Sequence, residues 1–456
     1  MTTETNNPGK TSYPSVNLNL NVRGLTPSAT LAINELSAEL IAQGRDIFKF
    51  GLGQSPFPVP RSVVEALKEN AHQKDYLPVK GLRELRDAVA QYHGRKHSIQ
   101  CTGDNVLVGP GSKELMFLIQ LVYYGDLCIP TPSWVSYEPQ AHIIGRPVRW
   151  LRTQADNNWG LMPAELEELC ADDPDRPRLV ILNYPHNPTG YSYGKDKLRQ
   201  LAEVARRYRV VLLSDEIYGE LHHAGKHTSI AEYYPEGTII SSGLSKWCGA
   251  GGWRLGTFTF PDNLHWLLDA MAAVASETFT ATSAPIQFAA IKAFVGGPEI
   301  ESYLSTSRRI LSALGQHCAA KLRDAGLRLG TPDGGFYLFP DFGAFEYELR
   351  ESGVSSSEEL CTHLLDKTGV ATVPGSAFGR SKDELTLRLA YVDFDGAEAM
   401  RAADALPKEA ALDEAFLRRY CSRVTDGIDR LHDWLSSMRP QTSFQLESAV
   451  RIRRRA

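Results

Sequence analysis

The sequence predicts an α/β protein with a mostly parallel sheet sandwiched by helices, plus a smaller α+β domain. Short apolar runs begin near residues 106, 127, 179, 210, 238 and 256, and helical patterns such as 195–208 separate several of them. Apolar strands that alternate with helices are typical of a parallel sheet covered on both faces. A chain of 456 residues is also too long for one core, which favours two lobes.

The pattern changes along the chain and divides it into five predicted segments. They are a disordered polar leader (1–22), the N-terminal part of the small domain (23–50), the large domain (51–300), the C-terminal small domain (301–405), and a helical C-terminal extension with a basic tail (406–456). A helix is expected to end near Gly44, and the late helix is expected to break or bend near Gly427. Small-domain strands are predicted at 335–339, 370–373 and 385–392.

Composition excludes several classes of function. The formal net charge of −5 gives no global basic field for nucleic acid, and the only basic run is the terminal RIRRRA. The seven cysteines form no CxxC pair, and no His/Cys cluster has zinc spacing, so neither a disulfide framework nor a metal site is predicted. No apolar run is long enough to span a bilayer, and no secretory signal is visible. We therefore expect a cytoplasmic protein.

Polar residues follow three neighbouring apolar runs, where strands are predicted to end. Asn187 lies in NYPHNPTG, Asp215 and Tyr218 lie in SDEIYGEL, and Lys246 follows TIISSGLS. In a parallel sheet such positions converge on one crevice, where ligands bind. Each residue alone also has an ordinary structural explanation: a turn, a helix cap, a core tyrosine or a solvated lysine. Their common order favours a shared site.

Four separated motifs carry a resemblance to a known family. NYPHNPTG (183–190), SDEIY (214–218), SSGLSK (241–246) and GGWRLG (251–256) occur in this order. Together they strongly resemble the fold-type I, class I aminotransferases that use pyridoxal 5′-phosphate, over roughly residues 30 to 400. The resemblance implies the fold-type I architecture, with 51–300 as the cofactor-binding domain.

The resemblance also implies roles for the residues at the strand ends. Lys246 would form a Schiff base with the cofactor aldehyde, and Asp215 would pair with the pyridinium nitrogen. Tyr218 and Asn187 would hydrogen-bond the ring hydroxyl oxygen. Arg254 would clamp the phosphate, because a guanidinium fork matches phosphate oxygens.

Further cofactor contacts are expected from three other segments. In GPGSKEL (109–115), Gly111, Ser112 and Lys113 would present backbone N–H groups to the phosphate at a helix N-terminus, unless this is an ordinary strand-to-helix turn. Trp134, in TPSWVSYEP, matches the residue that stacks on the cofactor ring, although a lone tryptophan is more often core. Tyr76 matches the tyrosine that reaches the neighbouring subunit's phosphate, which implies a homodimer with shared active sites; a solvent-facing tyrosine is the alternative.

The substrate expectations also rest on the resemblance. Arg388, in LTLRLAYVDF, matches the arginine that binds the substrate α-carboxylate, and a structural ion pair is the competing role. Gly53, in LGQSPFPVP, would close over the ligand, with Asn187 and Trp134 beside it. Lys113 matches a lysine of the bacterial aspartate and prephenate aminotransferase branch that reads the distal carboxylate. The Lys113 match favours aspartate or glutamate as substrate, and a lysine that merely occupies the first helical turn is the alternative. The family resemblance as a whole implies a 2-oxo acid as co-substrate and a ping-pong mechanism.

One departure and two alternatives remain open. Many relatives carry a serine three residues before the lysine, where this chain has Gly243, so one phosphate hydroxyl is missing or replaced. A carbon–sulfur β-lyase or an aminocyclopropane carboxylate synthase-like enzyme would share the fold and cofactor. A non-enzymatic, cofactor-binding regulatory module would carry a DNA-binding domain, for which the first 30 residues offer no helix-turn-helix segment.

Overall fold

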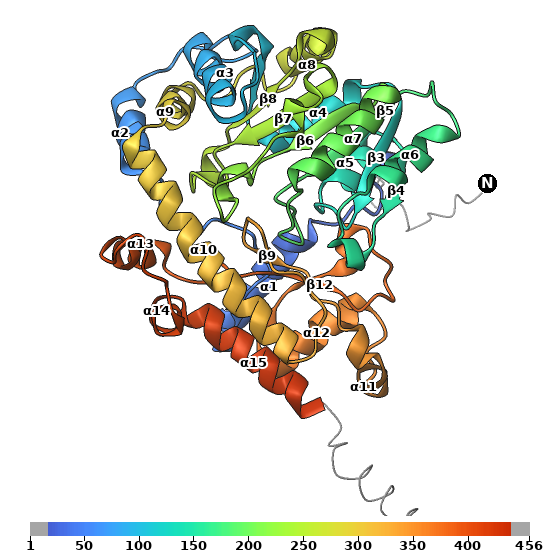
Figure 1. Cartoon of the computed structure of the whole chain (residues 1–456), viewed down its shortest axis with the longest axis vertical. Helices are drawn as coiled ribbons and strands as arrows, with labels where there is room; N and C mark the ends of the chain where they lie inside the picture. The colour runs from blue at the N-terminus through green and yellow to red at the C-terminus, as the bar shows by residue number, and fades with distance from the viewer. Residues whose placement is uncertain (1–16, 439–456) are drawn as a thin grey trace, which may run out of the picture.

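Seven strands form one sheet in the larger lobe of the computed structural model, which describes residues 17–438 (Figure 1). Their order is β2 (Val106–Gly109), β8 (Gly256–Thr259), β7 (Thr238–Gly243), β6 (Val211–Asp215), β5 (Arg178–Asn183), β3 (Asp126–Thr131) and β4 (Val148–Arg152). β8 runs antiparallel to both of its neighbours, and all other neighbouring pairs are parallel. The predicted mostly parallel sheet is confirmed.

Helices cover both faces of this sheet, and its central strands are therefore buried throughout. Leu179 and Ile181 of β5 pack on the side of α4 (Ser112–Val122), α5 (Tyr137–Ile143) and α8 (His265–Ser276). Val180 and Leu182 face the opposite side, with α6 (Pro163–Ala171) and α7 (Lys195–Arg207). Side chains that alternate between two apolar faces explain why the strand reads as a continuous apolar run.

Three further helices border the sheet at the β2 edge. There α2 (Arg61–Asn70) and α3 (Arg83–His97) pack against α9 (Ala284–Val295). The long helix α10 (Pro298–Asp324) then passes from the larger to the smaller lobe (Figure 1).

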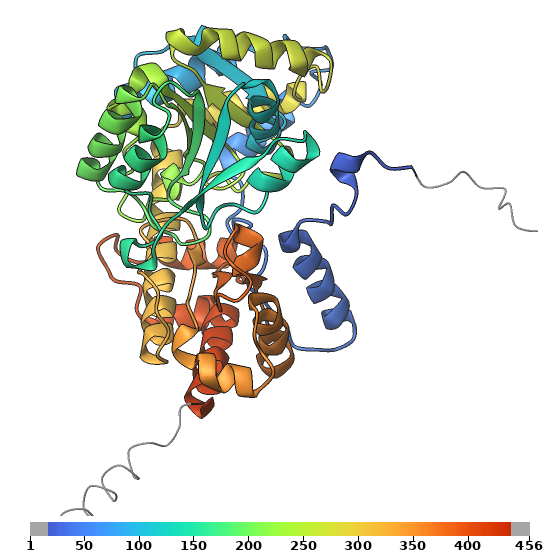
Figure 2. The same ribbon diagram turned by 90° about the vertical axis from the view of Figure 1, so that its right-hand side faces the viewer.

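The smaller lobe contains two short sheets and most of the remaining helices. Its three-stranded antiparallel sheet has the order β11 (Val373–Pro374), β12 (Leu387–Ala390), β9 (Tyr337–Leu338). β1 (Phe48–Lys49) pairs in parallel with β10 (Val370–Ala371), so an N-terminal segment completes a C-terminal lobe. The helices are α1 (Ala29–Ala42), α11 (Glu346–Glu351), α12 (Ser357–Thr368), α13 (Gly396–Asp404), α14 (Glu414–Tyr420) and α15 (Ser422–Met438). Figure 2 shows α1 lying along the side of this lobe.

The ends of the chain are covered only in part. Of the predicted disordered leader, residues 1–16 lie outside the described residues, and the remainder includes a 3₁₀ turn at Leu20–Val22. The basic tail RIRRRA likewise lies outside the described residues. The lobe boundaries given above stay predictions. The strands predicted in the smaller lobe exist but are only two to four residues long.

The predicted break near Gly427 is wrong. The late helical segment is interrupted at Cys421, between α14 and α15, and Gly427 lies inside the continuous helix α15. A β-carbon at residue 427 would lie 2.6 Å from Phe50 Cζ and 3.0 Å from Phe48 Cγ. The glycine is therefore required by close packing of the helix on two buried rings, not by a bend.

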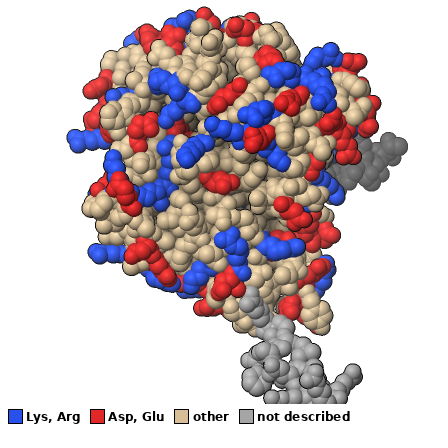
Figure 3. Space-filling model, in the orientation of Figure 1, with Lys and Arg blue, Asp and Glu red and all other residues tan. Residues whose placement is uncertain are grey.

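The outer surface mixes charges of both signs. On the face shown in Figure 3, basic and acidic side chains are interspersed over both lobes. Within residues 17–438, no helix combines the length and the apolar character that a membrane crossing needs.

Replacing Gly427 with alanine tests this packing. We expect Gly427→Ala to lower the free energy of unfolding by about 1–3 kcal/mol, because the added methyl group overpacks a core of aromatic rings. Thermal unfolding followed by circular dichroism measures the change. Gly194→Ala is the matched control, since a β-carbon there meets nothing within 4 Å. A stabilised Gly427→Ala protein, as a helix-propensity gain would give, contradicts the packing explanation.

Candidate active site

The strand ends meet at one cavity of about 540 Å³. Asp215 is the last residue of β6, and Lys246 lies three residues beyond the end of β7. The cavity is lined by Leu31, Leu52, Gly53, Gln54, Ser112, Lys113, Trp134, Asn183, Asn187, Asp215, Ile217, Tyr218, Ser245, Lys246, Gly251, Gly252 and Arg254. Nine of the residues singled out from the sequence are therefore brought together, from both sides of the sheet edge and from the N-terminal segment.

Asp215 presents a buried carboxyl group to this cavity. Tyr137 Oη donates a hydrogen bond to Asp215 Oδ2 at 2.6 Å, and Ser241 Oγ donates to Oδ1 at 3.2 Å. Burial raises the pKa of the carboxyl from 3.8 to about 6, and these hydrogen bonds act in the lowering direction. Asp215 is thus held in a fixed orientation at a site where ionisation is costly without a cationic partner.

Lys246 lies among aromatic rings and a backbone carbonyl. Its Nζ donates a hydrogen bond to Gly53 O at 2.7 Å and lies 5.6 Å from the ring centre of Tyr218. The carbonyl belongs to the loop before α2, so the lysine joins the larger lobe to the N-terminal segment. A β-carbon at residue 53 would collide with Tyr337 Oη, which explains the glycine.

Arg388 lies outside the cavity lining but is connected to it. Its guanidinium is 1% exposed, donates to Asn187 Oδ1 at 3.2 Å and also donates to Gly51 O. It lies between the rings of Tyr337 and Phe378, at 4.7 and 5.1 Å from their centres. Burial lowers the pKa of the guanidinium, and its Nε has no hydrogen-bond partner among the described residues. No carboxylate neutralises it there: within residues 17–438 it has no salt-bridge partner.

A concentration of positive charge forms where β2 leads into α4. Gly111 caps the helix with a φ of +92°, and a β-carbon there would collide with the guanidinium of Arg254. The amides of Ser112 and Lys113, the first two of α4, have no carbonyl partner within the helix, whereas the Glu114 amide donates to Gly111 O at 3.2 Å. Burial and the nearby Arg254 charge lower the pKa of Lys113. A helix N-terminus beside two cations suits an anionic group such as a phosphate.

Trp134 lines the cavity with its half-buried indole. The ring packs edge-on against Tyr137, with 5.2 Å between ring centres, and the Lys113 ammonium lies 5.7 Å from its centre. Tyr218 Oη and Tyr337 Oη lie 2.8 Å apart in a hydrogen bond. These contacts fix the aromatic side chains around the space above Asp215.

Tyr76 does not join the other predicted residues. It follows α2 in a loop, and 93% of its surface is exposed. Its expected function in a neighbouring subunit therefore stays a prediction.

The Gly243 departure has a steric reason. Gly243 pairs with Gly256 across β7 and β8, and a β-carbon at residue 243 would lie 2.8 Å from Leu255 O. A serine does not fit this backbone without movement. Ser245, which lines the cavity, is the hydroxyl residue nearest to Lys246 in the chain.

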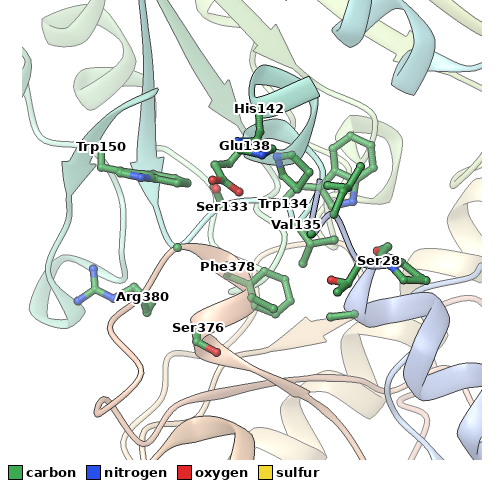
Figure 4. Close-up of a pocket in the computed structure, with 18 of the residues that line it drawn as sticks. Ser28, Ser133, Trp134, Val135, Glu138, His142, Trp150, Ser376, Phe378 and Arg380 are labelled. Atoms are coloured by element: carbon green, nitrogen blue, oxygen red, sulfur yellow. The ribbon is translucent and has the colours of Figure 1, made fainter. Parts of the chain in front are cut away.

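A second cavity of about 500 Å³ shares Trp134 with the first, and Figure 4 shows the residues that line it. It lies between the segment before α1, the beginning of α5 and residues 376–380 of the smaller lobe. Arg380 at its border is paired with Glu384 at 2.7 Å. Trp134 is the only predicted site residue in its lining, whereas nine line the first cavity.

Sequence reasoning missed three residues that hold the site together. Tyr137 and Ser241 bind the Asp215 carboxyl, and Tyr337 contacts Tyr218 and Arg388. Tyr137 lies only three residues after Trp134, so the sequence could have suggested it as a further site residue. Nothing in the local pattern around Tyr337 distinguishes it from a core tyrosine.

Comparison with known proteins decides the family. The profile described as "Aminotransferase class I and II" matches residues 45–406, well over half of the chain. The chain belongs to the class I and II aminotransferases.

Named relatives of this aminotransferase share most of its length. The aspartate aminotransferase of Bacillus sp. (strain YM-2) is 31% identical over 387 residues, which cover 81% of this chain and 93% of the relative. The aspartate/prephenate aminotransferase of Cereibacter sphaeroides is 31% identical over 390 residues, covering 83% and 94%. The solved aspartate aminotransferase of Thermus thermophilus with maleate superposes with a TM-score of 0.77 at 27% identity, covering 92% of this chain and 100% of that one. The predicted fold-type I architecture and aminotransferase function are confirmed.

The buried Asp215 carboxyl gives a pH-dependent prediction. Its pKa is higher in the folded than in the unfolded chain, so its cost to stability is absent near pH 4 and complete above about pH 6. We expect cofactor-free Asp215→Asn to be about 1–3 kcal/mol more stable than the parent at pH 7.5, with the difference shrinking toward pH 4.5. Urea unfolding across this pH range measures it, with Asp426→Asn, on the exposed side of α15, as control. A difference that does not vary with pH contradicts the assigned pKa direction.

Proposed function

We propose that this aminotransferase uses pyridoxal 5′-phosphate to move the amino group of an acidic L-amino acid, aspartate or glutamate, to a 2-oxo acid. The observation that carries the proposal is the pairing of a buried carboxyl, Asp215, with an amine, Lys246, in one cavity. The names of the relatives, aspartate and aspartate/prephenate aminotransferases, support the acidic substrate.

The residues around the cavity fit pyridoxal phosphate. The backbone is packed closely around the beginning of α4. A β-carbon at residue 111 would collide with Arg254, and one at residue 256 would collide with the Ser112 amide. This cradle of amides, Ser112 and Arg254 suits the phosphate. Asp215 suits a protonated ring nitrogen, because a cation beside it offsets the cost of burying its charge.

The remaining contacts follow from the same arrangement. Asn187 uses its Oδ1 to accept from Arg388, which leaves its amide nitrogen available to the ring hydroxyl oxygen. Tyr218, whose hydroxyl is hydrogen-bonded to Tyr337, lines the same cavity and would offer that hydroxyl to the ring oxygen. Trp134 offers a flat face for ring stacking. When bound, pyridoxal phosphate holds the amino group between the two halves of the reaction and withdraws electrons from the substrate Cα.

Lys246 performs the proton transfer in this proposal. Its Nζ would hold the cofactor before substrate binds. Once released, it would move the proton from the substrate Cα to the cofactor carbon that keeps the amino group, and would make the reverse transfer in the second half of the reaction. The neighbouring rings and the Gly53 carbonyl keep the amine within the cavity. Asp215 stays ionised against its pKa of about 6 at neutral pH, and so maintains the charge that favours loss of that proton.

Two cations would orient the substrate. Arg388 has a buried guanidinium without an ionic partner among the described residues, which suits the α-carboxylate of an amino acid. Lys113, across the cavity at Trp134, suits the distal carboxylate of aspartate or glutamate. The loop at Gly53 would then exclude water from the reacting atoms.

The proposal includes a homodimer in the cytoplasm. Tyr76 is almost fully exposed in the single chain, which is consistent with a side chain that completes the phosphate site of a second copy. All seven cysteines are free, which is consistent with a reducing compartment.

The decisive experiment is the visible absorbance of the purified holoenzyme. We expect a yellow band that L-aspartate bleaches without any acceptor and that 2-oxoglutarate restores, because each half-reaction is complete by itself. Lys246→Ala is expected to lose turnover, because the one other amine in the cavity lining, Lys113, is assigned to the substrate. A protein that takes up no cofactor contradicts the proposal. Release of ammonia and a 2-oxo acid without an acceptor identifies a lyase instead.

The distal carboxylate assignment has its own test. We expect Lys113→Ala to lower kcat/KM for L-aspartate about 10–100-fold, the loss of one charged hydrogen bond, and to change kcat/KM for L-alanine less than about 3-fold. Lys195→Ala, at the exposed beginning of α7, is the control. Equal losses for both substrates would show that Lys113 serves the phosphate rather than the substrate side chain.

A further inference from the structure

Three buried side chains with metal-binding atoms meet behind the active site. They are His97 at the end of α3, Glu216 directly after β6, and His227 in the loop that follows. One ring nitrogen of each histidine and one oxygen of Glu216 lie within 4.8 Å of one another. None of the three lines the active-site cavity, so the proposed aminotransferase chemistry does not use them.

Neighbouring hydroxyl groups hold the Glu216 carboxylate in place. Ser229 Oγ and Ser214 Oγ donate to Oε1, at 2.5 and 2.8 Å. The other oxygen, Oε2, faces His227 Nε2 at 2.8 Å. The hydroxyl groups fix one carboxylate oxygen and leave the second directed at His227, as outer contacts do for a metal ligand.

His97 has the arrangement of a ligand histidine. It is 7% exposed, and its Nδ1 faces Glu232 Oε1 at 3.4 Å without meeting hydrogen-bond geometry. A carboxylate next to one ring nitrogen commonly orients a metal-bound imidazole and leaves the other nitrogen for the metal. His227 Nδ1 is also buried without a hydrogen-bond partner among the described residues.

We propose that His97, Glu216 and His227 bind a divalent transition-metal cation, with Zn²⁺ preferred, and water as the fourth ligand. Two imidazoles and one carboxylate form a common zinc ligand set. Zinc ligands at about 2.0–2.2 Å from the metal lie roughly 3.5 Å apart. The His227 Nε2–Glu216 Oε2 pair, now at 2.8 Å, would therefore open slightly to admit the ion. The charges agree, because Glu216 and the adjacent Glu232 together balance a dication while both histidines stay neutral.

The environment of the cluster permits binding. Residues 224–226, in the same loop as His227, are exposed and give a short path from solvent. The site would tie α3 and this loop to the residue that follows Asp215, and so act structurally.

Metal content of the untagged, full-length holoenzyme tests the proposal. After removal of loosely bound metal with a chelator, titration with ZnCl₂ against a chromogenic competitor is expected to show about one tight equivalent per chain. His97→Gln and His227→Gln are expected to weaken this binding more than 10-fold, and Glu232→Gln about 10-fold. His142→Gln, an exposed histidine on α5, is expected to leave it unchanged.

Thermal unfolding separates a true site from a change in fold. Zn²⁺ is expected to raise the Tm of the parent and of His142→Gln, and to leave His97→Gln unshifted. Glu232→Gln keeps all three ligands, so it remains informative if the ligand variants unfold. Absence of a tight equivalent, or equal zinc binding by the parent and His97→Gln, overturns the proposal and leaves the cluster as a buried carboxylate–imidazole ion pair. Neither result depends on aminotransferase activity.

Discussion

The burial of the Asp215 carboxyl at the end of β6 is the constraint on which the site depends. A charge in that position is unfavourable without a partner, so the surrounding structure supplies donors from α5 and β7 and leaves one direction open toward the cavity. The same strand then places Glu216 on the opposite side, where imidazoles lower the pKa of its carboxyl. The pKa values of two adjacent acids are thus shifted in opposite directions: that of Asp215 is raised at the cavity, and that of Glu216 is lowered in the interior.

Close backbone approaches allow this concentration of charge. Gly111 and Gly256 bring β8, Arg254 and the beginning of α4 into contact, and Gly53 lets a loop pass over Tyr337. The result is a cavity lined by two cationic side chains from separate elements, Lys113 and Arg254, which repel each other. An anionic ligand would offset their repulsion and so stabilise the folded chain on binding.

The two lobes are coupled through Arg388. Its guanidinium lies on β12 of the smaller lobe, yet it donates to Asn187 of the larger lobe and to the Gly51 carbonyl in the N-terminal segment. Binding of a carboxylate there would act on all three segments at once. The proposed role of Arg388 in binding the substrate would therefore link substrate recognition to the relative position of the lobes.

The sequence by itself determined the mostly parallel sheet and most of the cavity. Apolar strand periodicity is a local property, and motif residues at strand ends, such as Asp215 and Lys246, converge because parallel strands end at one edge. Only the tertiary structure decided the role of Gly427, where a glycine that reads as a break packs instead against Phe48 and Phe50. It also decided the contacts of Tyr337 and the meeting of His97, Glu216 and His227. Those contacts join residues that are distant in sequence, and no local pattern encodes a contact between distant segments.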